Sequence, residues 1–177
     1  MTAFTAPSNP GVSYPPNTIM LAGELSLPLA NLIDDKAAYT ATIKPGMLVE
    51  MVNDAGTAKW QPHSSAAGQP PMFVALEDAI WGADYISSTV GNRGSVDTLY
   101  AAGQIVPVAA LRTGNKFWGL IPSGQNVNVG DALQSNGDGK LKAATASTAA
   151  AGVYRFQALE SPGAVTVDTR VVVQVVG

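Results

Sequence analysis

The feature that most constrains the fold of this 177-residue chain is a pentapeptide that occurs almost unchanged twice. Residues 73–77 read F-V-A-L-E, and residues 156–160 read F-Q-A-L-E, 83 positions later. A glycine-led strand pattern and an Asn/Asp/Gly turn precede each copy, with Gly46 and Gly130 in matching places, and a valine-rich run follows each copy. Four elements in the same order indicate an internal duplication of a β-unit.

The segments before each pentapeptide read as strand, turn and strand. Apolar residues alternate along residues 47–52, and residues 53–56 (N-D-A-G) supply turn chemistry, because Asn, Asp and Gly tolerate positive φ. Residues 135–139 (S-N-G-D-G) have the same composition in the second copy. Two such units would pair into one small barrel or sandwich, which also hides edge strands, so we expect an all-β fold.

We predict a β-body over residues 43–177, with repeat one at 43–110 and repeat two at 127–177. Between Glu77 and Val106 lie 28 residues, whereas 11 lie between Glu160 and Val172, so repeat one carries an insertion of about 17 residues.

The insertion falls at about residues 78–103. Insertions lie on surfaces and often carry function, so we expect a contact loop for a partner, with a merely tolerated long loop as the alternative. Its candidate contact residues are Trp81, Tyr85 and Arg93.

Residues 1–42 do not resemble a domain and are predicted to form an extended N-terminal arm. Six prolines punctuate the first 45 residues, and proline fixes φ and removes a backbone donor, which disfavours helix. Residues 19–27 are apolar enough to need a partner surface, so we expect the arm to lie across a neighbouring chain, a loose tail being the alternative. The candidate contacts on the arm are Tyr14, Pro15, Pro16, Ile19, Leu21, Leu25 and Leu27.

Charge and hydropathy argue against several classes of partner. Net charge is −3, and no run of Lys or Arg provides the basic stripe that phosphate binding needs, so no nucleic-acid partner is expected. No apolar run approaches the roughly 20 residues of a membrane span, and the N-terminus lacks the pattern of a signal peptide. We expect a soluble chain made in a cytoplasm, and the absence of Cys rules out disulfides.

Groups that carry chemistry are sparse. The chain has one histidine, His63, which is expected in an exposed loop, and any nucleophilic triad would have to use it as base. With no Cys and no second His a zinc site is not expected, and no cofactor is predicted. Glu77 and Glu160 are expected to have structural roles at strand ends, although an acid pair across a pseudo-twofold axis is a rival interpretation.

The chain resembles the capsid decoration (cement) proteins of tailed bacteriophages over roughly residues 43–177. The resemblance lies in P-G-M-L-V-E, N-D-A-G, F-V-A-L-E-D-A, Y-A-A-G-Q-I-V-P-V-A, V-N-V-G-D-A-L-Q-S-N-G-D-G-K-L-K-A and R-V-V-V-Q-V. It implies a small β-protein, often trimeric, that binds the outside of an icosahedral head and clamps neighbouring major capsid subunits. It implies no catalytic residues.

We therefore expect a structural protein on the outer face of a virion, made in the host cytoplasm, with the major capsid protein and further copies of itself as partners. A trimer is favoured, but the sequence leaves trimer and dimer open. Two alternatives remain: a phage head or tail surface module that recognises host glycans through the aromatic residues of the insertion, and a small carboxylate hydrolase.

Overall fold

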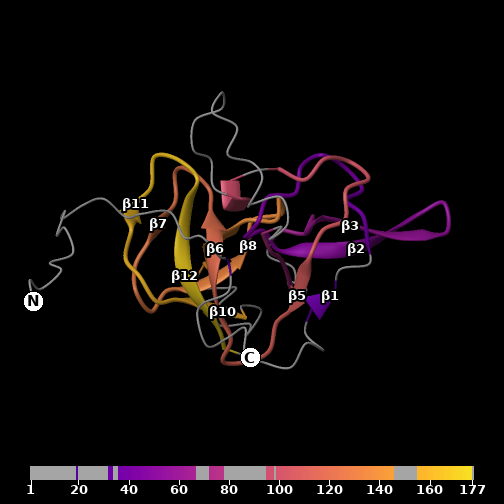
Figure 1. Ribbon diagram of the computed structural model, residues 1–177. Helices are drawn as coiled ribbons and strands as arrows, with labels where there is room; N and C mark the ends of the chain where they lie inside the picture. Colours follow the sequence, from indigo (N-terminus) through magenta and orange to yellow (C-terminus); the bar gives the residue numbers. More distant parts are fainter. Residues whose placement is uncertain are drawn as a thin grey trace, which may run out of the picture.

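A computed structural model describes residues 19, 32–33, 36–66, 72–77, 95–97, 99–145 and 155–176. In these ranges the chain forms twelve strands and one short 3₁₀ helix, Ser95–Asp97, which confirms the all-β prediction (Figure 1).

The strands divide into two sets along the chain. The first set is β1 Leu32–Ile33, β2 Val49–Asp54, β3 Thr57–Pro62, β4 Phe73–Ala75 and β5 Val108–Ala110. The second set is β6 Lys116–Ile121, β7 Asn126–Val127, β8 Ala132–Ser135, β9 Leu141–Ala143, β10 Phe156–Ala158, β11 Gly163–Ala164 and β12 Thr169–Val175.

The two sets have the same strand order. The second set forms a sheet with the order β6-β12-β10-β8-β9, and the first forms a sheet with the order β1-β5-β4. A bridge between Leu48 and Val74 joins β4 to the base of the β2–β3 hairpin, which extends the first order to β1-β5-β4-β2-β3. No sheet in the described ranges closes on itself, so the arrangement is sandwich-like and not a closed barrel.

The two sets also share their register. Phe73 of β4 pairs with Ala110 of β5, and Phe156 of β10 pairs with Val175 of β12. The hydrogen bond from Gly46 N to Ala75 O (2.8 Å) has an equivalent of the same length from Gly130 N to Ala158 O. The repeated pentapeptides therefore occupy equivalent positions in two equivalent sheets.

This register moves the predicted repeat boundaries. Leu32 pairs with Ala109 as Lys116 pairs with Gln174, so β1 is the counterpart of β6. The predicted limits of the arm at 1–42 and of the repeats at 43 and 127 are therefore wrong, because the sheets begin at β1 and β6. Leu32–Ile33 and the start of β6 share no residue types, which left the correspondence invisible in the sequence.

The insertion in repeat one is one residue longer than predicted. Leu76 N donates to Pro107 O, 31 residues on, and Leu159 N donates to Val172 O, 13 residues on, a difference of 18. The described part of the predicted insertion comprises Ser95–Asp97 and residues 99–103.

Two clusters of buried apolar side chains form the core. The larger cluster draws on both repeats and includes Phe117 and Phe156, whose rings meet edge to face at 5.7 Å. The smaller cluster belongs to repeat one alone and surrounds Trp60, whose ring centroid lies 5.3 Å from that of Phe73. Repeat one thus has a private core in addition to the shared one.

Equivalent glycines in the two repeats provide a matched test of their contact. Gly46 and Gly130 have φ of +88° and +87°, but a Cβ on Gly46 would lie 2.7 Å from Trp118 O, whereas a Cβ on Gly130 would meet no atom within 4 Å. Alanine in left-handed backbone costs about 1–2 kcal/mol, and forced overpacking adds about 1–3 kcal/mol. We expect Gly46→Ala to lower the free energy of unfolding by about 3 kcal/mol and Gly130→Ala by about 1 kcal/mol, measured by urea unfolding. Equal losses would show that the close approach at Gly46 is not a constraint.

Candidate functional site

Of the ten predicted contact residues, the structure describes Ile19. The other nine lie outside the described residues: Tyr14, Pro15, Pro16, Leu21, Leu25, Leu27, Trp81, Tyr85 and Arg93.

Ile19 is held by the body of its own chain. Its backbone N donates to Glu77 Oε2 (2.8 Å), and its carbonyl accepts a hydrogen bond from Trp118 N (2.8 Å). Its side chain has no exposed surface, joins the shared core and approaches Gly46. We call the site formed by Gly46, Glu77 and Trp118 the Ile19 socket. The expectation that Ile19 contacts a neighbouring chain is wrong for this structure, because the apolar side chain is buried against its own repeats.

A difference between the repeats makes Glu77 available to Ile19. The equivalent carboxylate in repeat two, Glu160, accepts a hydrogen bond from Val172 N (3.0 Å) within its own repeat. Pro107 occupies the place of Val172 in repeat one, and proline has no backbone N–H to donate. Glu77 therefore accepts its hydrogen bond from outside the repeat. Both glutamates bind backbone donors at strand ends, in line with their predicted structural roles.

The socket also closes an open strand edge. β6 is the outer strand of its sheet, and such an edge presents unpaired backbone groups. Trp118 N donates to Ile19 O, and Leu120 N donates to Gly46 O (3.3 Å). Residue 19 and the turn at Gly46 thus take the place of a neighbouring strand along β6.

A second polar cluster lies where the two hairpins meet. His63 Nδ1 lies 2.7 Å from Ser135 Oγ, and His63 Nε2 lies 3.8 Å from Glu50 Oε2. Ser135 has no exposed surface and His63 is 3% exposed, so the prediction of an exposed loop histidine is wrong. Backbone bonds fix the contact, because Gly139 N donates to His63 O and Leu48 N donates to Gly139 O.

Burial sets the protonation of this cluster. It lowers the pKa of His63 below the ordinary value, and the charge of Glu50 opposes that shift only in part. Burial disfavours the charged form of Glu50, but hydrogen bonds from Ser64 and Gln61 outweigh it and lower the pKa of this carboxyl. At neutral pH the cluster therefore holds a neutral imidazole beside an ionised carboxylate.

The order Glu50, His63, Ser135 is that of a nucleophilic triad, but the geometry does not suit one. A triad needs hydrogen-bond reach of about 2.6–3.2 Å between base and orienting group, and the His63–Glu50 separation is longer. Ser135 Oγ is enclosed and accepts a hydrogen bond from Gly137 N (3.1 Å), so an acyl group has no approach to it. In this arrangement the cluster joins β8 of repeat two to the end of β3 in repeat one.

Charged side chains add further links between and within the repeats. Arg170 of β12 donates to Asp97 Oδ1 (2.7 Å), to Pro45 O (3.2 Å) and to Val96 O, and Asp97 also lies 3.4 Å from Lys44 Nζ. Burial opposes ionisation of Asp97, but the hydrogen bond and charge of Arg170 hold its pKa below the usual range. Arg170 thus carries a charged link from repeat two into repeat one.

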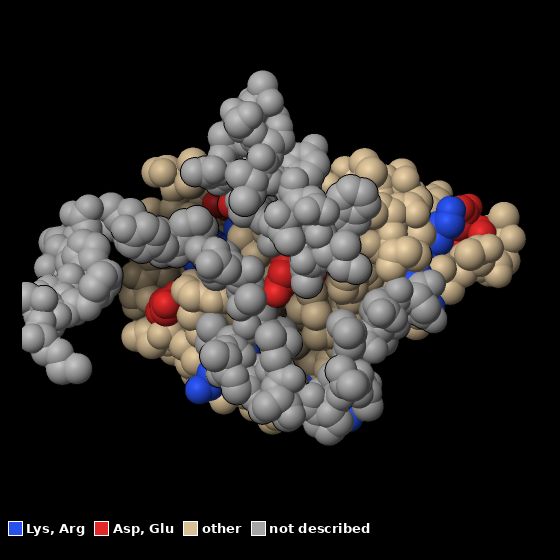
Figure 2. Space-filling model, viewed as in Figure 1, with Lys and Arg blue, Asp and Glu red and all other residues tan. Residues whose placement is uncertain are grey.

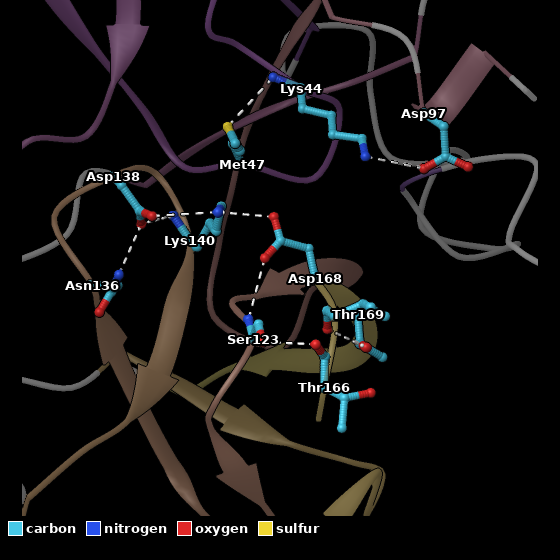
Figure 3. A network of polar contacts seen from close by, with 11 residues as sticks. Lys44, Met47, Asp97, Ser123, Asn136, Asp138, Lys140, Thr166, Asp168 and Thr169 are labelled. Atoms are coloured by element: carbon cyan, nitrogen blue, oxygen red, sulfur yellow. Dashed lines mark hydrogen bonds and ion pairs between the residues drawn. The ribbon is translucent and has the colours of Figure 1, made fainter. Parts of the chain in front are cut away.

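A neighbouring network pins two loops of repeat two together. Figure 3 shows Lys140 between two carboxylates, with Nζ 2.8 Å from Asp168 and 3.5 Å from Asp138. Burial disfavours the charged ammonium, but the hydrogen bond to Asp168 outweighs it and raises the pKa of Lys140. Asp168 also accepts from Ser123 N (3.2 Å), which ties the turn before β12 to the hairpin β8–β9.

The hairpin of β2 and β3 is the most asymmetric surface feature. Both hairpins pair in equivalent register as far as Met51–Trp60 and Ser135–Leu141, but repeat one then continues for eight residues and repeat two for five. The extra ladder projects away from the sheets in Figure 1. We call residues 51–59 the projecting hairpin.

The projecting hairpin has two different faces. Met51, which is 55% exposed, lies with Asn53 and Ala58 on an uncharged face. Asp54 and Lys59 form an ion pair of 2.6 Å on the other face, and acidic and basic atoms lie together near its end in Figure 2. The tip is a two-residue turn in which Ala55 has φ +49° and Gly56 has φ +88°. A side chain in left-handed backbone is strained, and such strain is typical of sites with a function.

Other site types find no counterpart in the part of the chain that the structure describes. No group of three or more His, Cys, Asp or Glu residues there is arranged to hold a metal ion. None of the helices described there has the length and apolar character needed to cross a membrane. No protein-family model matches the chain, and no curated protein shows significant similarity to it.

Sequence reasoning missed the residues that join the repeats. Ser135 and His63 lie 72 positions apart, and Arg170 and Asp97 lie 73 apart, so no local pattern links either pair. One signal was available for the socket: Pro107 breaks the correspondence with Val172 at the place where the equivalent glutamates need a donor.

The buried histidine predicts a loss of stability in mild acid. The unfolded chain binds a proton at His63 near pH 6.5, whereas the folded chain binds it at lower pH. Its contribution is therefore complete above pH 6.5 and falls as the pH drops through the folded pKa, by up to about 1.4 kcal/mol per pH unit. We expect urea unfolding from pH 7.5 to 4.5 to show this slope, and His63→Gln to flatten it.

A second loss below pH 4.5 should remain in His63→Gln, because Glu50, Asp97 and Asp168 have lowered pKa values and contribute stability only while ionised. Identical slopes for both chains between pH 7 and pH 5 would show that His63 is not the titrating group.

Proposed function

We propose that the chain is a capsid decoration protein that binds the outer surface of an icosahedral phage head and clamps neighbouring major capsid subunits. The proposal includes self-association, with a trimer favoured, and a location on the outer face of the virion. It is supported by the resemblance of residues 43–177 to the decoration proteins and by the duplicated β-body. Such a body is stiff, because each repeat is cross-linked to the other at His63, Arg170 and Gly46.

The observation that carries the proposal is the projecting hairpin. A two-stranded ladder without a third strand is marginally stable in water, so its extension in repeat one calls for a stabilising contact elsewhere. Its exposed Met51 and its small tip residues suit a shallow apolar recess or an open strand edge on a shell subunit. Many copies that bind one shell also gain avidity, so each contact can be modest.

Repeat two provides the variant that tests the role of the projecting hairpin. Residues 52–59 are replaced by residues 136–140 (N-G-D-G-K), which connect the equivalent strands with a short turn. We expect a folded chain whose affinity for undecorated heads falls at least about tenfold, or roughly 1.4 kcal/mol, because the projecting contact is lost. Binding is measured by co-sedimentation with heads, and occupied positions are imaged by cryo-electron microscopy.

The matched control is Val167→Asp, which alters a valine that is 66% exposed in repeat two. It should leave head binding unchanged. Loss of binding in the control but not in the grafted chain would assign the contact to repeat two. A wild-type chain that ignores heads but binds oligosaccharides would favour the glycan-binding alternative.

Deletion of residues 1–17 separates the N-terminal segment from the Ile19 socket. A longer deletion would remove Ile19 and open the shared core, which costs about 2–5 kcal/mol for a large buried aliphatic side chain. The shorter deletion should leave the free energy of unfolding within about 0.5 kcal/mol of the wild type and weaken head binding, if the segment contacts the shell. Unchanged head binding would remove residues 1–17 from the contact surface.

A further inference from the structure

We propose that the Ile19 socket is a docking site for an extended peptide, and that in an oligomer its occupant is the residue-19 segment of a second copy of the chain. The inference goes beyond head binding and concerns how copies are tied to one another. Its three parts are the chemistry of the socket, the lack of an internal partner for Glu77, and the length of chain between Ile19 and Leu32.

The socket recognises backbone as well as side chain. Glu77 Oε2 accepts the N–H of residue 19 and Trp118 N donates to its carbonyl, so both polar groups of one extended residue are bound. The side chain of that residue is fully buried beside Gly46, which leaves room for a branched aliphatic group. This is recognition by strand addition, in which main-chain bonds give affinity and a pocket gives specificity.

The socket requires a donor from outside its own repeat. Glu160 is satisfied by Val172 N, but Pro107 offers Glu77 no equivalent donor. A carboxylate without its hydrogen bond at a partly buried site is costly, so the socket favours an occupied state. The identity of the chain that supplies the occupant does not alter the contacts made in the socket.

The connection to the body is long enough to reach a neighbour. Thirteen residue steps separate Ile19 from Leu32 in the sequence, which span at most about 45 Å when extended. A folded chain of 177 residues has a radius of gyration of about 16 Å, hence a diameter of roughly 40 Å. The segment can therefore fill the equivalent socket of a touching copy. In a closed ring each copy gives one segment and receives one, so every socket stays filled.

Exchange is favoured where copies are held together. An occupant on the same chain competes with an effective concentration in the millimolar range for a flexible tether. Contact between copies in an oligomer or on a shell brings the second socket into the same range, whereas a dilute chain closes on itself. The occupant seen here, bound by its own body, is the form expected of a single copy.

Single-cysteine variants test the exchange, because the chain has no native Cys. Chains carrying Ile19→Cys and chains carrying Trp118→Cys are mixed while reduced, concentrated into the oligomeric fraction and then oxidised without heads. We expect a disulfide-linked pair at least about tenfold above that from a matched mixture of Val167→Cys and Trp118→Cys. The double variant Ile19→Cys/Trp118→Cys, oxidised when dilute, should close within one chain and shows that the two positions can bond.

Closure within the double variant with no link in the mixture above the Val167→Cys control would overturn the proposal. A second measurement does not depend on disulfide geometry: Ile19→Asp is compared with wild type by size-exclusion chromatography with light scattering. We expect the folded variant to lose the oligomer, whereas Val167→Asp keeps it. An oligomer unaffected by Ile19→Asp, or a wild-type chain that stays monomeric at millimolar concentration, would overturn the exchange. Because these experiments contain no heads, such a failure leaves the proposed function to its own test.

Discussion

The structure depends on how the open edge of β6 is closed. An outer strand with unpaired backbone groups would be a site of aggregation, yet Trp118 N and Leu120 N are satisfied by Ile19 O and Gly46 O. The approach is feasible because residue 46 has no side chain, since a Cβ there would collide with Trp118 O. One glycine, placed by the duplication, thus sets the distance between the turn of repeat one and the sheet of repeat two. The buried position of Ile19 and the reach of Arg170 to Pro45 lie around the same contact.

The two repeats show how a duplicated scaffold diverges without losing its register. Gly46 and Gly130, and likewise Glu77 and Glu160, keep equivalent places. Two changes separate the copies. Pro107 removes a donor and turns a carboxylate outward from its own repeat, and the β2–β3 hairpin is extended by three residues. Each change adds a feature in repeat one that its counterpart lacks, and the two proposals above rest on one change each.

The sequence predicted most of the fold because the evidence for it is local. Alternation along β2, the turn at residues 53–56 and the F-x-A-L-E strands depend on neighbouring residues, and all appear in the structure. The starts of the repeats escaped detection because β1 and β6 are equivalent in hydrogen bonding but not in residue type.

The candidate site was less predictable because its partners are far apart along the chain. The apolar character of Ile19 correctly indicated a buried position, but sequence cannot tell whether the surface that covers it belongs to the same chain. His63 was misplaced because a histidine after proline in a polar stretch looks exposed until Ser135 is brought beside it. Long-range contacts of this kind follow from topology and not from local pattern.

The two cores imply a direction of assembly during synthesis. The cluster around Trp60 is made wholly from repeat one, whereas the buried side chains of repeat two belong to a cluster completed by Leu48, Val74 and Ile19. Chains emerge from the ribosome N-terminus first, and a segment with its own core can collapse before the remainder appears. The first copy can therefore serve as the template on which the second condenses, and a circular permutant that begins at β6 would meet the ribosome exit with no such template.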